Sequence, residues 1–305
     1  MVEKFKIWLK ELRAPFFTAS IVPVFVGTAS AWHQGVPFRL WDFIICLIAM
    51  IALHAGCNMA NDYYDYVNKT DMINEDITPF SGGSRMIPEG FLKPKSVLIA
   101  ALIAFGIGSS LGLYLVWTRG WPILVIGIIG VFLAFFYSAP PVFIASTGLG
   151  ELAISIGFGP LPVLGAYYVQ AQSFSIEALW ASVPVALLIA AVIYINEFPD
   201  VPADSMVGKK TLVVRLGKAK ALYGYLALLF FSYAIPLLGV ALGYLPWPSL
   251  LIFITIPLAV KSYKNAARFY NTTPRLIPSN AFTILIHLTT GILLTIGLAS
   301  AKFIW

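Results

Sequence analysis

Nine apolar stretches, each long enough to cross a lipid bilayer, dominate this sequence. A helix needs roughly 20 apolar residues to span a hydrocarbon core of ~30 Å. The stretches fall at about 14–32, 40–61, 96–117, 121–139, 148–170, 176–195, 219–242, 247–263 and 280–301. With 59% hydrophobic residues, only 11% charged residues and a mean hydropathy of +0.84, the chain cannot cover a soluble surface with polar groups. We therefore predict an all-α integral membrane protein with nine transmembrane helices.

The distribution of Lys and Arg predicts the orientation of these helices. If the N-terminus lies in the cytoplasm, seventeen of the twenty basic residues fall inside, and only Arg39, Arg119 and Lys302 fall outside. Basic residues are enriched in cytoplasmic loops. One miscounted helix would place every later loop on the opposite side, and the basic residues would no longer concentrate on one side. Because the inner basic residues are scattered over four segments, the pI of about 9.2 reflects membrane orientation and not nucleic-acid binding. We expect a multi-pass protein of the cell membrane.

The residues before the first apolar stretch predict an interfacial helix. Residues 1–13 are charged, yet Phe5, Trp8, Leu9 and Leu12 share one helical face. We expect this helix to lie along the cytoplasmic surface of the membrane.

Most of the acidic residues fall in two long cytoplasmic segments, about 62–95 and 196–218. Together these segments hold nine of the fourteen acids. Long connections usually carry function, since compact membrane bundles otherwise use short links. We therefore place the chemistry of the protein at the cytoplasmic ends of the helices.

The two acidic segments resemble each other. Asn61 and Asp65 are repeated by Asn196 and Asp200, 135 residues later, and each pair is followed by a further Asp, glycines and basic residues. Such a repeat suggests a duplicated bundle whose two motifs face one another. We predict one domain over residues 1–305, with two related halves at about 14–140 and 148–263 and a final helix at 280–301.

Residues four apart share a helix face, so each motif presents several oxygen atoms together. This applies to Asn61 with Asp65, to Asn196 with Asp200, and to Asp204 if the helix continues through Pro199 and Pro202. Oxygen ligands without His or Cys favour Mg²⁺, which keeps positions open for water and phosphate. A diphosphate bridging two metal ions is the ligand that we expect.

Basic residues and glycines beside the motifs suit phosphate oxygens. They are Arg85 with the backbone amides of residues 81–84, and Lys209, Lys210 and Arg215. The alternative is that the acids are merely solvated and that the Gly-Gly pair is only a turn. A cluster of acids at the end of a membrane helix usually has a partner, which favours the binding site.

These residues resemble the UbiA superfamily of intramembrane prenyltransferases along nearly the whole chain. The resemblance rests on the two Asp-rich motifs, on Asp71 six residues after Asp65, and on the GGSR sequence that follows. It is strongest to the MenA-type branch, which prenylates 1,4-dihydroxy-2-naphthoate. The segments YSAPP at 137–141 and GLGE at 148–151 are also similar to the superfamily.

The resemblance implies a nine-helix bundle around a central cavity that opens to lipid, with two Mg²⁺ ions and an isoprenyl diphosphate donor. Its implied metal ligands are Asn61, Asp65, Asp71, Asp200 and Asp204. Arg13, Lys210 and Asn196 match positions that hold diphosphate, and Tyr137 matches an aromatic position near the reacting carbon. Several branches carry a Lys after the YSP-like segment, but this chain has Val142 and Phe143 there.

We therefore predict Mg²⁺-dependent transfer of an isoprenyl group to an aromatic acceptor, with Asp65, Asp200 and Tyr137 as the catalytic residues. His54 and Glu151 are candidates for the acceptor pocket, although a buried histidine is also common in a packed core. A glycerol-phosphate ether lipid is the alternative acceptor. An ion-coupled transporter is the alternative from another class, but its acids should lie near the middle of the membrane.

Overall fold

The computed structural model describes residues 2–304, and the described chain contains helices and no strand. In chain order the helices are α1 (Val2–Glu11), η1 (Ala14–Phe17), α2 (Thr18–His33), α3 (Leu40–Val67), α4 (Thr70–Ile73), α5 (Pro94–Arg119), α6 (Pro122–Phe136), η2 (Ile144–Ser146), α7 (Gly150–Phe158), α8 (Pro160–Ala171), α9 (Ile176–Met206), α10 (Leu212–Leu216), α11 (Lys218–Ala241), η3 (Trp247–Thr255), α12 (Ile256–Phe269) and α13 (Thr273–Ala301). The all-helical prediction is confirmed.

Eight helical segments of the described chain are long and apolar enough to cross a membrane. The ninth apolar helix, α6, has only 15 residues. At 1.5 Å per residue it is about 22 Å long, shorter than a ~30 Å hydrocarbon core. The described chain therefore supports a multi-pass membrane protein, and nine complete spans stay a prediction.

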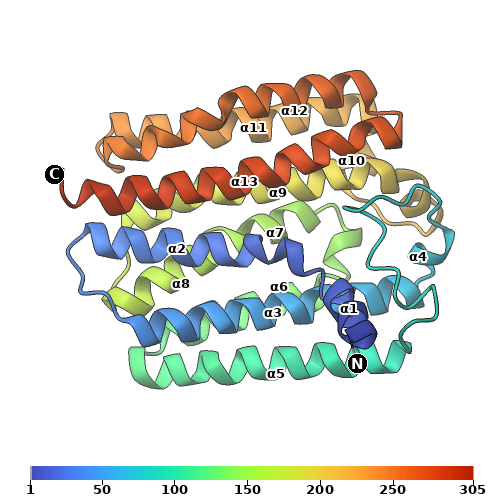
Figure 1. The fold of residues 1–305 in the computed structure, drawn as a ribbon, viewed down its shortest axis with the longest axis horizontal. Coiled ribbons are helices and arrows are strands. Elements are labelled where there is room, and N and C mark those ends of the chain that lie inside the picture. Colours follow the sequence, from blue (N-terminus) through green and yellow to red (C-terminus); the bar gives the residue numbers. More distant parts are fainter. Residues whose placement is uncertain (1, 305) are drawn as a thin grey trace.

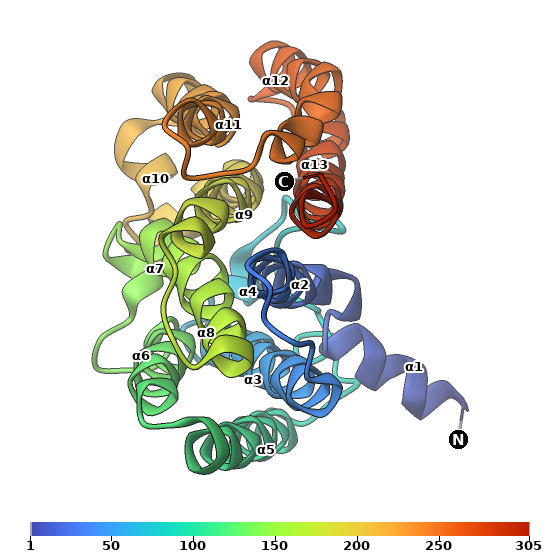
Figure 2. The ribbon, with the colours of Figure 1, turned by 90° about the vertical axis from the view of Figure 1, so that its left-hand side faces the viewer.

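The long helices run side by side along the longest axis of the molecule (Figure 1). The C-terminal ends of α3 and α9 lie at the same end as α4 and α10, and the C-terminus of the chain lies at the other end. Viewed along the helices, α1 points away from the bundle (Figure 2). In α1, Trp8 contacts the hydrophobic cluster of α3 and α5, whereas Phe5 and Leu9 are exposed.

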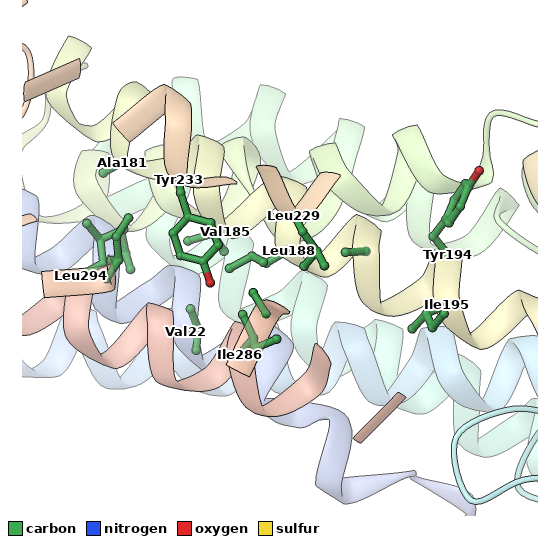
Figure 3. Packing of buried hydrophobic residues seen from close by; sticks show 14 of the residues in the cluster. Val22, Ala181, Val185, Leu188, Tyr194, Ile195, Leu229, Tyr233, Ile286 and Leu294 are labelled. Carbon is green, nitrogen blue, oxygen red and sulfur yellow. The ribbon is translucent and has the colours of Figure 1, made fainter. Parts of the chain in front are cut away.

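The largest hydrophobic cluster joins α2, α9, α11 and α13 (Figure 3). Val22, Leu188 and Ile286 meet there from three of these helices. Gly291 lets α13 approach α2 closely, because a Cβ atom at this position would lie 2.3 Å from Val22. Close packing of small residues stabilises helices in lipid, which offers no hydrophobic driving force between them.

Helix α9 is longer than the apolar stretch 176–195 predicted. It continues through Pro184, Pro199 and Pro202 and ends only at Met206. The second acidic motif is therefore helical, as the shared face of Asp200 and Asp204 requires.

The predicted stretch at 148–170 is found as the membrane-spanning segment Gly150–Ala171, which is divided at Gly159 into α7 and α8. A Cβ atom at Gly159 would lie 2.4 Å from the Cβ of Ala186 and 2.6 Å from the Ser155 carbonyl oxygen. The close approach to α9 requires glycine, and glycine accepts the non-helical backbone found there. The stretch at 247–263 is also divided, because its first part is the 3-10 helix η3.

Candidate active site

A polar hollow of about 110 Å³ lies where α3, α4 and α9 end. It brings both acidic motifs together with the glycine loop and the segment after α9. The charged residues that line it are Arg13, Asp65, Asp71, Glu197, Asp200, Asp204 and Lys209. Five carboxyl groups thus face two basic groups.

The first motif is held by hydrogen bonds within α3 and to the segment after α6. Asn61 Nδ2 donates to Asp65 Oδ2 at 3.0 Å and to Ser138 Oγ at 2.8 Å. Both donor hydrogens of this amide are therefore used, and its carbonyl oxygen is left as the acceptor. The spacing of four residues places Asn61 and Asp65 on one face, as predicted.

The second motif is supported by two asparagines from elsewhere in the chain. Asn74 Nδ2 donates to Asp200 Oδ1 at 2.8 Å, which ties the loop after α4 to α9. Asn280 Nδ2, from α13, donates to Asn196 Oδ1 at 2.7 Å. This bond uses the side-chain oxygen of Asn196 and not its amide nitrogen. Asn196 also lines the hollow.

Lys209 connects the two motifs. Its ammonium lies 2.7 Å from Asp65 Oδ1 and 3.8 Å from Asp204 Oδ1. Burial disfavours the charged form, but Asp65 and Asp204 outweigh burial, and the pKa of Lys209 is raised above its ordinary value. Lys209 therefore stays positively charged between the carboxylates.

Asp71 lies on the short helix α4, against the glycine loop. A Cβ atom at Gly83, whose φ is +72°, would lie 2.7 Å from Asp71 Oδ2. Burial, together with the charges of Asp65 and Asp62, raises the pKa of Asp71 to about 9. Only a glycine leaves room for the carboxyl group here.

Arg13 reaches the hollow from the junction of α1 and η1. Its Nη1 lies 4.0 Å from Asp62 Oδ1, and its guanidinium lies 5.1 Å from the ring centre of Phe16. Ser84 in turn links α1 to α3, because its Oγ donates to Glu11 Oε2 at 2.6 Å and its backbone N–H donates to Asp62 Oδ2 at 3.0 Å. The N-terminal segment is thereby fixed to the glycine loop.

Three of the basic residues expected at the diphosphate, Arg85, Lys210 and Arg215, do not line the hollow. Arg85 donates a hydrogen bond to the backbone carbonyl of Asp71 and forms an ion pair with Glu89 at 3.9 Å. It therefore holds the backbone of α4. The side chain of Lys210 is exposed, although its backbone is bonded to Ser146. Lys209 and Arg13, which were also expected there, do line the hollow, and so does Gly83 of the glycine loop.

A second, apolar cavity of about 530 Å³ lies between α3, α5, α6, α7 and α8. Tyr137 is the residue that lines both this cavity and the polar hollow. The apolar wall includes Leu113, Ile128 and Phe132 of α5 and α6, which are also exposed on the outside of the bundle. The two cavities together suit a molecule with a charged head and a long apolar tail.

Of the two acceptor-pocket candidates, His54 lines one of these cavities and Glu151 lines neither. His54 lines the apolar cavity, and its Nδ1 is hydrogen-bonded to Ser20 Oγ at 2.8 Å. Glu151 is buried and accepts a hydrogen bond from the Leu212 N–H at 2.8 Å.

The chemistry of the hollow fits Mg²⁺. The donors are carboxylate and amide oxygens, and five carboxyl groups against two basic groups leave negative charge without compensation. In residues 2–304 no three acidic, His or Cys side chains converge on one metal position. Mg²⁺ typically binds one or two carboxylates and completes its shell with water and phosphate oxygens, so a dispersed set is appropriate.

Sequence reasoning missed the residues that support the motifs. Asn280 had a recognisable signal, since a buried amide in a membrane helix needs a partner. Asn74 and Ser138 had none, because their bonds join segments that are 126 and 77 positions apart. Glu197 lines the hollow beside Asn196, but the motif spacing alone did not distinguish it.

Residues 20–286 match the model of the UbiA prenyltransferase family. The chain is 29% identical over 300 residues to the 2-carboxy-1,4-naphthoquinone phytyltransferase of Synechocystis, covering 96% of this chain and 92% of that protein. It is also 29% identical to the 1,4-dihydroxy-2-naphthoate octaprenyltransferase of Bacillus subtilis, covering 94% and 90%.

Solved structures share the fold. A digeranylgeranylglyceryl phosphate synthase superposes with a TM-score of 0.66 at 19% identity, covering 98% of this chain and 99% of that one. A UbiA homologue from Archaeoglobus fulgidus, bound to GPP and Mg²⁺, superposes with a TM-score of 0.61 at 15% identity, covering 94% and 99%.

Proposed function

This chain belongs to the UbiA prenyltransferase family, and from that premise we propose that it transfers an isoprenyl group from a prenyl diphosphate to 1,4-dihydroxy-2-naphthoate. Its relatives named above are prenyltransferases of naphthoate compounds, so an intramembrane aromatic prenyltransferase is its class of enzyme. The proposal adds the donor, the acceptor, the use of two Mg²⁺ ions and the residues that act.

The observation that carries the proposal is the position of Tyr137 between two unlike cavities. A prenyl diphosphate is charged at one end and apolar over the rest of its length. The polar hollow would hold the diphosphate and the apolar cavity would hold the isoprenyl chain. The C–O bond that breaks would then lie beside Tyr137.

The residues of the hollow would bind and orient the donor. Lys209 and Arg13 contribute positive charge, and the amide groups of Asn61 and Asn196 point polar atoms at the same space. Asp65, Asp71, Asp200 and Asp204 would hold Mg²⁺, which when bound neutralises diphosphate charge and favours its departure. Arg85 and Lys210 act indirectly in this proposal, through the backbone segments that they support.

Tyr137 would stabilise the positive charge that develops on the allylic carbon. The face of an aromatic ring attracts a cation, and the effect is largest where water is excluded. The apolar walls of the larger cavity would keep water from the cation. The electron-rich naphthalene ring would then attack this carbon to form a carbon–carbon bond, while the C–O electron pair leaves with diphosphate and the attacked ring carbon loses H⁺ or CO₂.

We place the hollow on the cytoplasmic side of the cell membrane. The support is the distribution of basic residues, of which seventeen out of twenty share the side of the acidic motifs. A water-soluble naphthoate and Mg²⁺ would then reach the site directly from the cytoplasm.

A direct assay tests the proposal. The purified full-length protein in lipid nanodiscs is given Mg²⁺, prenyl diphosphates of several lengths and either 1,4-dihydroxy-2-naphthoate or a glycerol-phosphate ether lipid. We expect a prenylated naphthalene product, and none after chelation of the metal. Prenylation of the ether lipid alone would show that the acceptor is wrong. Failure to bind any prenyl diphosphate would favour a transporter.

A further inference from the structure

One strongly polar side chain lies in the wall of the otherwise apolar cavity. Of the residues that line this cavity, only His54, Ser109 and Tyr137 carry a side-chain nitrogen or oxygen atom. Tyr137 stands at the junction with the polar hollow, whereas His54 precedes Asn61 by seven residues on α3. Seven residues make nearly two turns, so His54 shares the helix face of Asn61 and lies about 10 Å farther from the hollow.

The imidazole ring of His54 is held in one orientation. Its Nδ1 forms a buried hydrogen bond of 2.8 Å with Ser20 Oγ on α2. The rings of Phe17 and Phe158 pack against it edge to face, with centroid distances of 5.4 and 4.7 Å. One hydrogen bond and two aromatic contacts therefore position this side chain before any ligand binds.

The second ring nitrogen of His54 has no partner. In residues 2–304 no hydrogen bond is formed by Nε2, yet packing does not enclose this atom completely. The side chain is only 7% exposed and belongs to the wall of the apolar cavity, so its open side is toward that cavity. A buried polar atom without a partner is costly, and a hydrocarbon tail cannot supply one.

Burial of a histidine in this fold does not by itself create such an opening. His287 of α13 is 2% exposed, and its unpaired Nε2 is completely enclosed. It lines neither the apolar cavity nor the polar hollow. A ligand in the apolar cavity thus meets His54, whereas His287 is out of its reach.

The chemistry of Nε2 favours a hydroxyl group as the missing partner. The tautomer of His54 decides whether Nε2 donates or accepts, because either tautomer can form the bond to Ser20. A hydroxyl group satisfies both tautomers, since it donates and accepts. A carboxylate only accepts, and a prenyl tail does neither.

We propose that His54 Nε2 binds a ring hydroxyl group of the aromatic acceptor, an inference that rests on the proposed function. The acceptor ring then lies in the apolar cavity next to Tyr137, where the C–O bond of the donor breaks. The hydrogen bond fixes which ring carbon faces the allylic carbon. His54 thereby selects hydroxylated aromatic acceptors and positions them.

The test measures acceptor binding to the full-length protein in nanodiscs, with Mg²⁺ and a nonhydrolysable prenyl diphosphate present. The probes are 1,4-dihydroxy-2-naphthoate and two analogues that each lack one hydroxyl group, 1-hydroxy-2-naphthoate and 4-hydroxy-2-naphthoate. His54→Leu should weaken binding of the dihydroxy compound by roughly 10-fold, as expected for one lost hydrogen bond, and leave donor binding unchanged. The analogue without the hydroxyl group that His54 binds should have the same affinity for wild type and variant.

Three further variants separate ligand binding from a structural role. His287→Leu removes a comparably buried histidine and should leave acceptor affinity unchanged. Ser20→Ala breaks the bond to Nδ1 but keeps Nε2, so affinity should stay within about 3-fold of the wild type. His54→Gln retains a hydrogen-bonding group and should keep most of the affinity. If His54→Leu does not fold, His54→Phe replaces it, because a ring still fits between Phe17 and Phe158.

Three results would overturn the inference. They are unchanged affinity of His54→Leu for the dihydroxy compound, equal losses for all three naphthoates, and equal losses from Ser20→Ala and His54→Leu. The proposed function fails in a different way, since a wild type that prenylates no aromatic acceptor would contradict it whatever the His54 variants bind.

Discussion

Lys209 and Asp65 form an ion pair of 2.7 Å across 144 positions of the chain. Asp65 ends the first motif on α3, and Lys209 follows the second motif on α9. The pair thus joins the two halves of the hollow before any ligand arrives. It also neutralises part of the charge that would otherwise separate the acidic motifs.

Replacing Lys209 by Met should destabilise the protein. Removing one partner leaves buried carboxylates uncompensated, which costs on the order of 3 kcal/mol or more. We expect a lower thermal midpoint in nanodiscs, partly restored by Mg²⁺, and a higher KM for the donor. Lys210→Met is the control, because that side chain is exposed and should leave the midpoint unchanged. Equal effects of the two substitutions would contradict the role of Lys209.

Asp65→Asn and Asp200→Asn should abolish prenyl transfer while the bundle stays folded. Each substitution keeps the size of the side chain but removes a charge that would bind Mg²⁺. We expect a loss of at least about 100-fold with a normal elution volume. The thermal midpoint should stay normal for Asp200→Asn and fall for Asp65→Asn, because the latter breaks the ion pair with Lys209. Isothermal titration with Mg²⁺ and a nonhydrolysable donor should show the binding defect directly. Retained turnover by a folded variant would argue against a metal role.

Tyr137→Phe and Tyr137→Leu separate the ring from the hydroxyl. If the ring face stabilises the allylic cation, Phe should stay within a few-fold of the wild type. Leu should lose about 1 to 2 kcal/mol, or roughly 5- to 30-fold in the transfer rate. Single-turnover measurements with saturating donor report this step. A large loss with Phe would assign the hydroxyl group instead.

Gly83→Ala should impair the hollow more than Gly90→Ala. Both glycines have positive φ angles, +72° and +78°, so the backbone strain is similar. Only at Gly83 would the new Cβ meet Asp71, at 2.7 Å, whereas nothing lies within 4 Å at Gly90. We expect weaker Mg²⁺-dependent donor binding for Gly83→Ala alone. Identical binding curves would show that Asp71 can move without loss.

Stability should fall with rising pH, and Glu11 should contribute to this. Burial and the charge of Asp62 raise the pKa of Glu11 from 4.5 to about 8, while Ser84 and Arg13 oppose the shift. The neutral form is favoured in the folded protein, so its contribution is complete below pH 4.5 and is lost as the pH rises through about 8. Glu11→Gln should flatten this part of the curve. Thermal midpoints between about pH 6 and 9 measure the difference, and parallel slopes for both proteins would contradict it.

The sequence predicts most of the long helices, because membrane helices are specified by the length and polarity of apolar stretches. The spacing of Asn61 with Asp65, and of Asn196 with Asp200, also predicts that two motifs face one hollow. The division of the segment into α7 and α8 at Gly159 cannot be predicted from the sequence, because it results from contact with Ala186 on another helix. Tertiary contacts of this kind leave no local signal.

Long-range contacts also explain which basic residues reach the hollow. Lys209 and Lys210 are adjacent and identical in chemistry, yet only Lys209 points between the carboxylates. Arg85 ends the GGSR sequence on which the resemblance rests, but its guanidinium donates a hydrogen bond to the backbone carbonyl of Asp71. Composition and spacing cannot separate such neighbours, because the difference lies in the ion pair that Lys209 forms with Asp65, a residue 144 positions away.

The division of the interior at Tyr137 has a consequence for product release. If the proposed function holds, the donor would be held at both ends, by its charges in the polar hollow and by its hydrocarbon chain in the apolar cavity. Breaking the bond beside Tyr137 would leave diphosphate and the alkylated product on opposite sides of this residue. The inorganic product could then depart into water and the apolar one into lipid, and neither would have to pass the other.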